Sequence, residues 1–189
     1  KKVSVMKKFP VLENNLVHIA VNINSSELFI LRRWPEEYFR DLIGFMQQDI
    51  INLQVYLVGG KNDLSVVRSF YKTIPDKRGI HITAGKLDIL EFTYLLNKMT
   101  FLITNDSGPL HIAELQQIPV VSFFGPETPN LFGPINNNSM IFYKNIFCSP
   151  CLNVYNHKRS DCRDNQCLKL ISPSDVYTEM KSKVLRNIV

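Results

Sequence analysis

Five short apolar runs constrain the fold of this chain more than any other feature. Such runs, rich in β-branched and aromatic residues, are typical of buried strands, and the amphipathic stretches between them are long enough to form helices. Strands that alternate with helices in this way predict an α/β fold built on a doubly wound parallel sheet. The five runs lie at residues 16–21, 53–58, 80–83, 101–104 and 120–124.

The stretches between the runs carry helix signals. Pro35 stands where a helix can begin, and Glu36 and Glu37 follow in a first turn that favours negative charge. Ligands of open parallel sheets bind outside the carboxyl ends of the strands, so the loops there are the candidate site. Further helices are expected over residues 64–71, 88–97 and 109–116 and after residue 172.

Composition limits the class of protein. With 189 residues, 45% of them apolar and 21% charged, the chain can bury the core of one globular domain. No apolar run is long enough to span a bilayer, and the opening lacks a secretory signal. The net charge of +5 favours anionic partners, but the basic residues form no run that indicates specific nucleic-acid binding.

Two segments differ in amino-acid composition from the rest of the chain. Residues 1–15 are polar and basic, which predicts a linker or tail, and residues 146–172 hold all four cysteines. Because the chain starts with Lys1 and not Met, we expect a processed product or a piece of a longer protein.

The strongest local signal lies at residues 104–111, where a strand ends in small polar residues. Gly108 and Pro109 then open a helix, whose free N–H groups and partial positive charge suit a phosphate. His111 comes about one turn later and could face the same ligand as Asp106. The alternative is an ordinary helix that Asp106 or Ser107 caps.

A second phosphate candidate is the loop after the first strand. Ser25 lies in its polar start, and Arg32 or Arg33 could clamp a phosphate with paired hydrogen bonds. The alternative is a solvated basic loop in which Trp34 packs before the helix.

Two further loops follow strand ends. Asp63, after Gly59 and Gly60, could accept hydrogen bonds from ribose hydroxyls or cap the next helix. Glu127 and Thr128 could line a sugar pocket, although their loop is also rich in ordinary turn residues.

The four cysteines could enclose a structural zinc ion, with His157 as a substitute ligand. Disulfides and unliganded thiols are the alternatives, and no cysteine has a base fixed nearby by sequence. The four are Cys148, Cys151, Cys162 and Cys167.

Several common motifs are absent. The chain lacks the glycine-rich dinucleotide fingerprint, the phosphate-loop Gly-Lys-Ser/Thr and the zinc-protease His-Glu-x-x-His. Their absence argues against a dinucleotide oxidoreductase, an NTPase and a zinc protease.

Taken in order, several blocks resemble the C-terminal half of family 9 glycosyltransferases, the ADP-heptose:lipopolysaccharide heptosyltransferases. The resemblance runs from about residue 16 to the C-terminus, and residues 105–111 are its most specific part. The cysteine-rich tail is also similar to tails in that family. The blocks are residues 32–39, 58–63, 84–88, 104–113 and 119–126.

The resemblance implies a GT-B enzyme with two Rossmann-like domains. Residues 16–189 would form the donor-binding domain, and residues 1–15 would come from a missing N-terminal domain that carries the acceptor site and the catalytic base. No catalytic residue is then expected in this chain. Carried over by resemblance, Arg32 would hold the donor phosphates, Asp63 the ribose, Ser107 and Gly108 the diphosphate, and Asp106 and His111 the transferred sugar.

Two positions depart from the family pattern. The loop at Asn24 lacks the usual Pro-Gly turn, and Arg32 replaces the usual lysine, which changes the geometry of the charged group.

The implied function is the donor half of an inverting, metal-independent transferase that needs no cofactor for catalysis. Its partners would be an ADP-heptose-like donor and, through the missing domain, a glycolipid acceptor. The location would be cytoplasmic, with peripheral association at the inner face of the bacterial inner membrane. The alternatives are a GT-B domain for a UDP- or GDP-sugar, or a non-catalytic Rossmann-like module with a structural four-cysteine zinc site.

Overall fold

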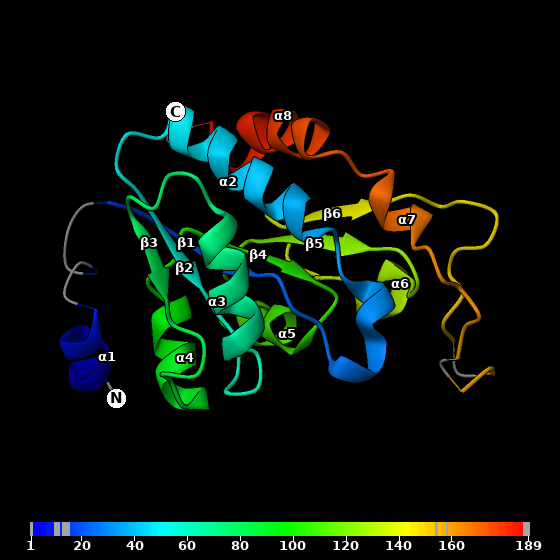
Figure 1. Cartoon of the computed structure of the whole chain (residues 1–189), viewed down its shortest axis with the longest axis horizontal. Coiled ribbons are helices and arrows are strands. Elements are labelled where there is room, and N and C mark those ends of the chain that lie inside the picture. Colours follow the sequence, from blue (N-terminus) through cyan, green and yellow to red (C-terminus); the bar gives the residue numbers. More distant parts are fainter. Residues whose placement is uncertain (1, 10–11, 13–15, 154, 158, 187–189) are drawn as a thin grey trace.

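A six-stranded sheet forms the centre of the computed structural model, which describes residues 2–9, 12, 16–153, 155–157 and 159–186 (Figure 1). The strand order is β3-β2-β1-β4-β5-β6, and every neighbouring pair is parallel. The winding direction therefore reverses between β1 and β4, which confirms the doubly wound α/β prediction. The strands are β1 Val17–Asn22, β2 Leu53–Leu57, β3 Ile80–Ile82, β4 Phe101–Asn105, β5 Val120–Phe124 and β6 Met140–Tyr143.

Helices cover both faces of the sheet. Side chains alternate along each strand, so Ile19 and Val21 of β1 join the core on one face and Ala20 joins the core on the other. The first core includes α2 Glu36–Asp49, α3 Leu64–Thr73, α7 Gln166–Lys169 and α8 Pro173–Lys183; the second includes α1 Lys2–Lys8, α4 Ile89–Leu96 and α5 Gly108–Leu115. Within the described ranges, no helix is long and apolar enough to cross a membrane.

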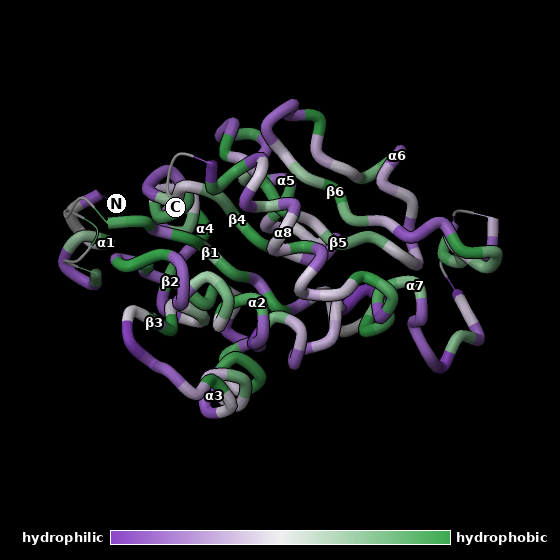
Figure 2. The backbone as a smooth tube through the Cα atoms, turned by 90° about the horizontal axis from the view of Figure 1, so that it is seen from above, coloured by the Kyte–Doolittle hydropathy of each residue, from purple (hydrophilic) through white to green (hydrophobic). Residues whose placement is uncertain are grey.

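Burial on both faces explains the continuous apolar runs of the central strands. In the view from above, β1 and β4 are mostly hydrophobic along their length (Figure 2). Such strands lack the polar–apolar alternation of a sheet that has one solvated face. For this reason the runs could be recognised in the sequence.

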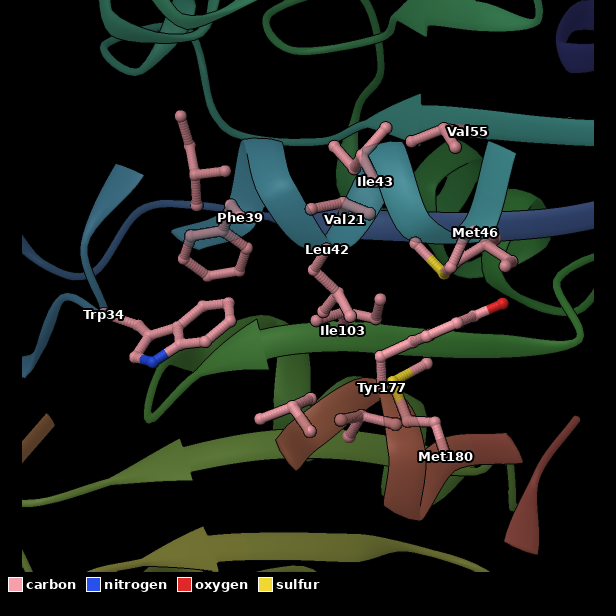
Figure 3. Packing of buried hydrophobic residues seen from close by; sticks show 14 of the residues in the cluster. Val21, Trp34, Phe39, Leu42, Ile43, Met46, Val55, Ile103, Tyr177 and Met180 are labelled. Carbon is pink, nitrogen blue, oxygen red and sulfur yellow. The ribbon is translucent and has the colours of Figure 1, made fainter. Parts of the chain in front are cut away.

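Trp34 is fully buried in the larger core, immediately before α2 (Figure 3). Its ring stacks on Phe123 of β5 with centroids 4.0 Å apart and meets Phe39 of α2 edge-on at 4.9 Å. The indole Nε1–H donates to the Ile171 carbonyl oxygen at 2.9 Å. The packing alternative for Trp34 therefore describes this residue in the structure, and α2 begins at Glu36 as expected.

The sequence pattern does not predict several of the observed elements. The loop after β1 contains a 3-10 helix, η2 Glu27–Arg32, and β6 adds a sixth strand at the edge of the sheet. The β6 run is only four residues long, and Ile141 within it is exposed, so its pattern was too short to identify. A short helix, α6 Pro129–Phe132, follows β5.

The start of the chain differs from the expected linker. Lys2–Lys8 forms α1, which packs against α4, and Val5 is fully buried. Glu91 of α4 accepts hydrogen bonds from Ser4 Oγ and from Lys8 Nζ. The linker expected over residues 1–15 is therefore helical over residues 2–8; its residues 1, 10–11 and 13–15 lie outside the described part.

The structure does not gather the cysteines into a metal site, which was one of three possibilities for them. Cys148 is exposed, Cys151 and Cys162 are half-buried, and all four thiols are free. Cys167 is buried in the larger core beside Gly125. A Cβ atom added to Gly125 would lie only 2.6 Å from the Cys167 sulfur. Among the described residues, no group of three or more His, Cys, Asp or Glu side chains could hold a metal ion.

The contact between α1 and α4 predicts a pH-dependent contribution to stability. Hydrogen bonds from Lys8 and Ser4 lower the pKa of Glu91 to about 2. Because this is below its ordinary value of 4.5, the stabilisation is complete above pH 4.5 and is lost as the pH falls toward 2. Glu91→Gln, which can keep the helix cap, should lower the thermal unfolding midpoint at pH 7. The difference in unfolding midpoint between the variant and the unsubstituted chain should disappear as the pH falls from about 4.5 to 2.

Asp76→Asn is the matched control. Arg78 also lowers the pKa of Asp76 to about 2, but the two residues are only two positions apart and can pair in the unfolded chain as well. The effect of Asp76→Asn on the unfolding midpoint should therefore change less with pH. If the midpoint difference caused by Glu91→Gln stayed constant with pH, the charge of Glu91 would not contribute to the packing of α1.

Cysteine burial predicts unequal reactivity. Burial raises the pKa of the Cys167 thiol to about 11, so it carries little thiolate near neutral pH. Near about pH 8, a thiol reagent should modify Cys148 first and Cys167 only when the chain unfolds, as mass spectrometry of digested samples can show. Protection of all four thiols together, released by a chelator, would instead indicate a shared metal.

Candidate functional site

A pocket of about 840 Å³ opens at the carboxyl ends of the strands. Its walls come from the loops after β1, β2 and β3 and from the start of α5, on both sides of the point where the winding reverses. This is where open α/β sheets bind ligands, and the volume lies within the usual range for ligand pockets. The polar residues of its wall include Asn22, Asn24, Ser25, Lys61, Asp63, Asp88 and Ser107.

Two buried asparagines fix the loop after β1. Asn22 Nδ2 donates to Ser107 Oγ at 2.9 Å and to the Asn24 carbonyl oxygen at 3.1 Å. Asn105 Nδ2 donates to the same Asn24 oxygen at 3.3 Å, and Asn105 Oδ1 accepts the Trp34 backbone N–H at 2.8 Å. The sequence alone predicts no role for Asn22, and Asn105 is there only part of a resembling block. Their position at the ends of apolar strands was the available signal.

Ser25 lines the pocket as expected, but its hydroxyl also stabilises the loop. Ser25 Oγ donates to the Phe29 carbonyl oxygen at 2.8 Å. Arg33 Nη2 donates to the Ser25 carbonyl oxygen at 3.1 Å, so Arg33 holds the loop. The loop therefore presents Ser25 on a fixed backbone.

The start of α5 faces the pocket without a side-chain cap. Ser107 occupies the N-cap position, yet its hydroxyl donates to the Asn105 carbonyl oxygen at 3.1 Å and makes no cap hydrogen bond. Gly108 is exposed, and a Cβ atom on it would meet no atom within 4 Å. The helix therefore presents its partial positive charge to the pocket and leaves room for a close backbone approach. This arrangement differs from the ordinary capped helix of the alternative interpretation.

Asp63 also lines the pocket, on the loop after β2. It stands at the N-cap position of α3 but makes no side-chain cap hydrogen bond. Its Oδ2 instead accepts the Gly60 N–H at 2.7 Å. A Cβ atom on Gly59 would lie 2.8 Å from Asp63 Cβ, so only glycine lets this loop pack closely.

Arg32 lies in a charged cluster beside the pocket. It forms ion pairs with Glu127 and with Asp106 Oδ2, the latter at 3.3 Å, and it stacks over the Phe29 ring at 4.2 Å. Both carboxylates are buried. The structure thus brings together two expected site residues, Arg32 and Asp106, with Glu127 of the β5 loop.

The expected residues divide between the pocket and its surroundings. Ser25, Asp63, Ser107 and Gly108 line the pocket. Arg32, Asp106 and His111 are not among the described residues that line the pocket. His111 is exposed on α5.

An apolar wall completes the pocket and was not expected from the sequence. It is formed by Val58, Leu87, Ile89, Phe92 and Ile112. Ile89 is 62% exposed at the start of α4. A flat apolar group, such as a nucleobase, suits such a wall.

Comparison with known proteins agrees with this architecture. The chain is 25% identical over 154 residues to lipooligosaccharide heptosyltransferase 2 of Campylobacter jejuni subsp. jejuni, a match that covers 79% of this chain and 46% of that protein. The chain thus spans about half the length of the curated relatives it matches first.

Two solved structures share the fold. The E. coli ADP-heptose lps heptosyltransferase II superposes with a TM-score of 0.77 at 19% identity, over 100% of this chain and 52% of that one. The glycosyl transferase family 9 structure from Veillonella parvula gives a TM-score of 0.78 at 20% identity, over 98% of this chain and 52% of that one.

The family model of glycosyltransferase family 9 (heptosyltransferase) matches residues 9–160. Because this match covers more than half of the chain, the chain belongs to glycosyltransferase family 9.

Proposed function

We propose that this chain is the donor-binding half of an inverting glycosyltransferase and that its pocket takes an ADP-sugar. The observation that carries the proposal is the uncapped start of α5, which opens into the pocket at the carboxyl end of β4. A helix N-terminus binds phosphate through its free N–H groups and its dipole. Ser107 and Gly108 would then contact the diphosphate.

The rest of the pocket suits the nucleoside. Asp63 offers carboxylate oxygens to ribose hydroxyls, and the apolar wall offers a surface for the base. ADP is the preferred nucleotide because the E. coli relative of the same fold is named for ADP-heptose. UDP- and GDP-sugars are the alternatives that the binding experiment below separates.

The mechanism follows from what such a pocket holds. An acceptor hydroxyl, deprotonated by a base expected outside this chain, would attack the anomeric carbon while the bond to ADP breaks. The leaving diphosphate gains negative charge, which the start of α5 would stabilise. Asp106 and His111 would contact the transferred sugar. Arg32 would hold the donor phosphates from the charged cluster beside the pocket.

We also propose an acceptor and a cellular location for the complete enzyme. The curated relatives are named for lipooligosaccharide and lipopolysaccharide synthesis, which supports a glycolipid acceptor and work at the inner face of the bacterial inner membrane. The acceptor would be held by a part of the enzyme outside this chain, so this chain alone is expected to bind donor and to transfer no sugar.

Gly108→Ala tests the phosphate contact. The added methyl group meets no protein atom within 4 Å, so the fold should tolerate it, but it would occupy the space that a phosphate enters. Calorimetric titration should show ADP binding to the unsubstituted chain, preferred over UDP and GDP. Affinity of the variant for ADP should fall about tenfold, which corresponds to about 1.4 kcal/mol.

Gly44→Ala is the matched control because its added Cβ also meets nothing within 4 Å, but on α2. Both variants should keep or raise the thermal midpoint, since alanine is the better helix former. Absence of binding by any nucleotide would contradict the proposed function. An equal loss of affinity in both variants would contradict the phosphate contact.

A further inference from the structure

Asn24 carries an unpartnered amide in the wall of the pocket. The residue is only 3% exposed, and within the described part of the chain neither its Oδ1 nor its Nδ2 has a hydrogen-bond partner. Buried side-chain amides are almost always hydrogen-bonded, because an unpaired one loses its bonds to water without replacement. Such a group in a pocket wall indicates that its partner is a ligand.

The backbone of Asn24 is held from two sides. Its N–H donates to Asn22 Oδ1 at 3.3 Å, and its carbonyl oxygen accepts from Asn22 Nδ2 at 3.1 Å and from Asn105 Nδ2 at 3.3 Å. These three hydrogen bonds hold the main chain of Asn24 in place. The side chain is placed in advance on a rigid loop.

Asp63 reaches the same region from the loop after β2. A Cβ atom on Gly59 would lie 3.1 Å from Asp63 Oδ2 and 3.4 Å from Asn24 Nδ2. Asp63 Oδ2 and Asn24 Nδ2 therefore approach each other beside Gly59, where only glycine leaves room for both side chains. A carboxylate that accepts and an amide that both donates and accepts converge there.

These donors and acceptors select among ligand groups. A phosphate only accepts hydrogen bonds, so it would leave Asn24 Oδ1 unpaired. A hydroxyl both donates and accepts, and two adjacent hydroxyls could satisfy both amide atoms and the carboxylate together. The chemistry therefore favours a vicinal diol.

We propose that Asn24 is a specificity-determining residue that, together with Asp63, reads the ribose diol of the bound nucleotide. This inference rests on the proposed function, because it takes the ligand to be a nucleotide. The pocket then selects ribonucleotides over their deoxy analogues.

Titration with ADP, 2′-deoxy-ADP and 3′-deoxy-ADP tests the assignment. The unsubstituted chain should bind ADP at least about tenfold more tightly than either deoxy analogue. Asn24→Leu, which keeps the approximate shape and removes the amide, should weaken ADP binding and bring the three affinities within about twofold of one another. Asn24→Ala is the second variant if leucine disturbs the fold.

Asn52→Ala is the control, since Asn52 is exposed just before β2 and outside the pocket lining, and it should leave the preference for ribose unchanged. Equal binding of ADP and both deoxy analogues by the unsubstituted chain would overturn the inference and leave the proposed function standing. An Asn24→Leu variant that keeps the full preference for ADP would do the same. Failure of the unsubstituted chain to bind any of the three would overturn the proposed function and the inference with it.

Discussion

The hydrogen bond from the Trp34 backbone N–H to Asn105 Oδ1 is the contact on which the pocket depends most directly. It ties the loop after β1 to the end of β4, on opposite sides of the point where the winding reverses. Asn105 also holds the Asn24 carbonyl oxygen, and the Trp34 ring is fixed by Phe123 and by its bond to Ile171. The core of the domain and the wall of the pocket are therefore set by one connected group, and packing errors at Trp34 would move ligand-facing residues.

Charge is divided between two places in this site. The guanidinium of Arg32 is matched by the carboxylates of Asp106 and Glu127, so its field at the pocket is largely cancelled. The positive charge that faces the pocket comes instead from the start of α5 and from the exposed Lys61, while Asp63 and Asp88 add carboxylates to its wall. A phosphate that reached Arg32 would have to compete with these carboxylates. Neutral backbone dipoles attract a diphosphate without the strong desolvation cost of burying a free cation.

The sequence predicted what depends on local patterns and missed what depends on distant partners. Five of the six strands of the sheet and the Gly108 helix start could be identified, because apolar runs and a Gly-Pro pair are local signals. The local pattern predicts a linker where α1 lies, because the packing of α1 requires Glu91, far along the chain. The spacing of the cysteines allowed zinc, but no group of three or more metal-binding side chains is found among the described residues. The donor roles of Arg32, Asp106 and His111 stay predictions.

Asn24 shows why the least predictable part of a site can be its most informative. No sequence pattern could show that both of its amide atoms are buried without partners, since this follows from Asn22 and Asn105 holding the backbone in place. An unpaired buried amide destabilises the empty fold by about 1–3 kcal/mol. Mutation readily removes such a cost when nothing offsets it. Its position beside Gly59 and Asp63, where a ligand with adjacent hydroxyls can pair with it, provides a physical reason for keeping it.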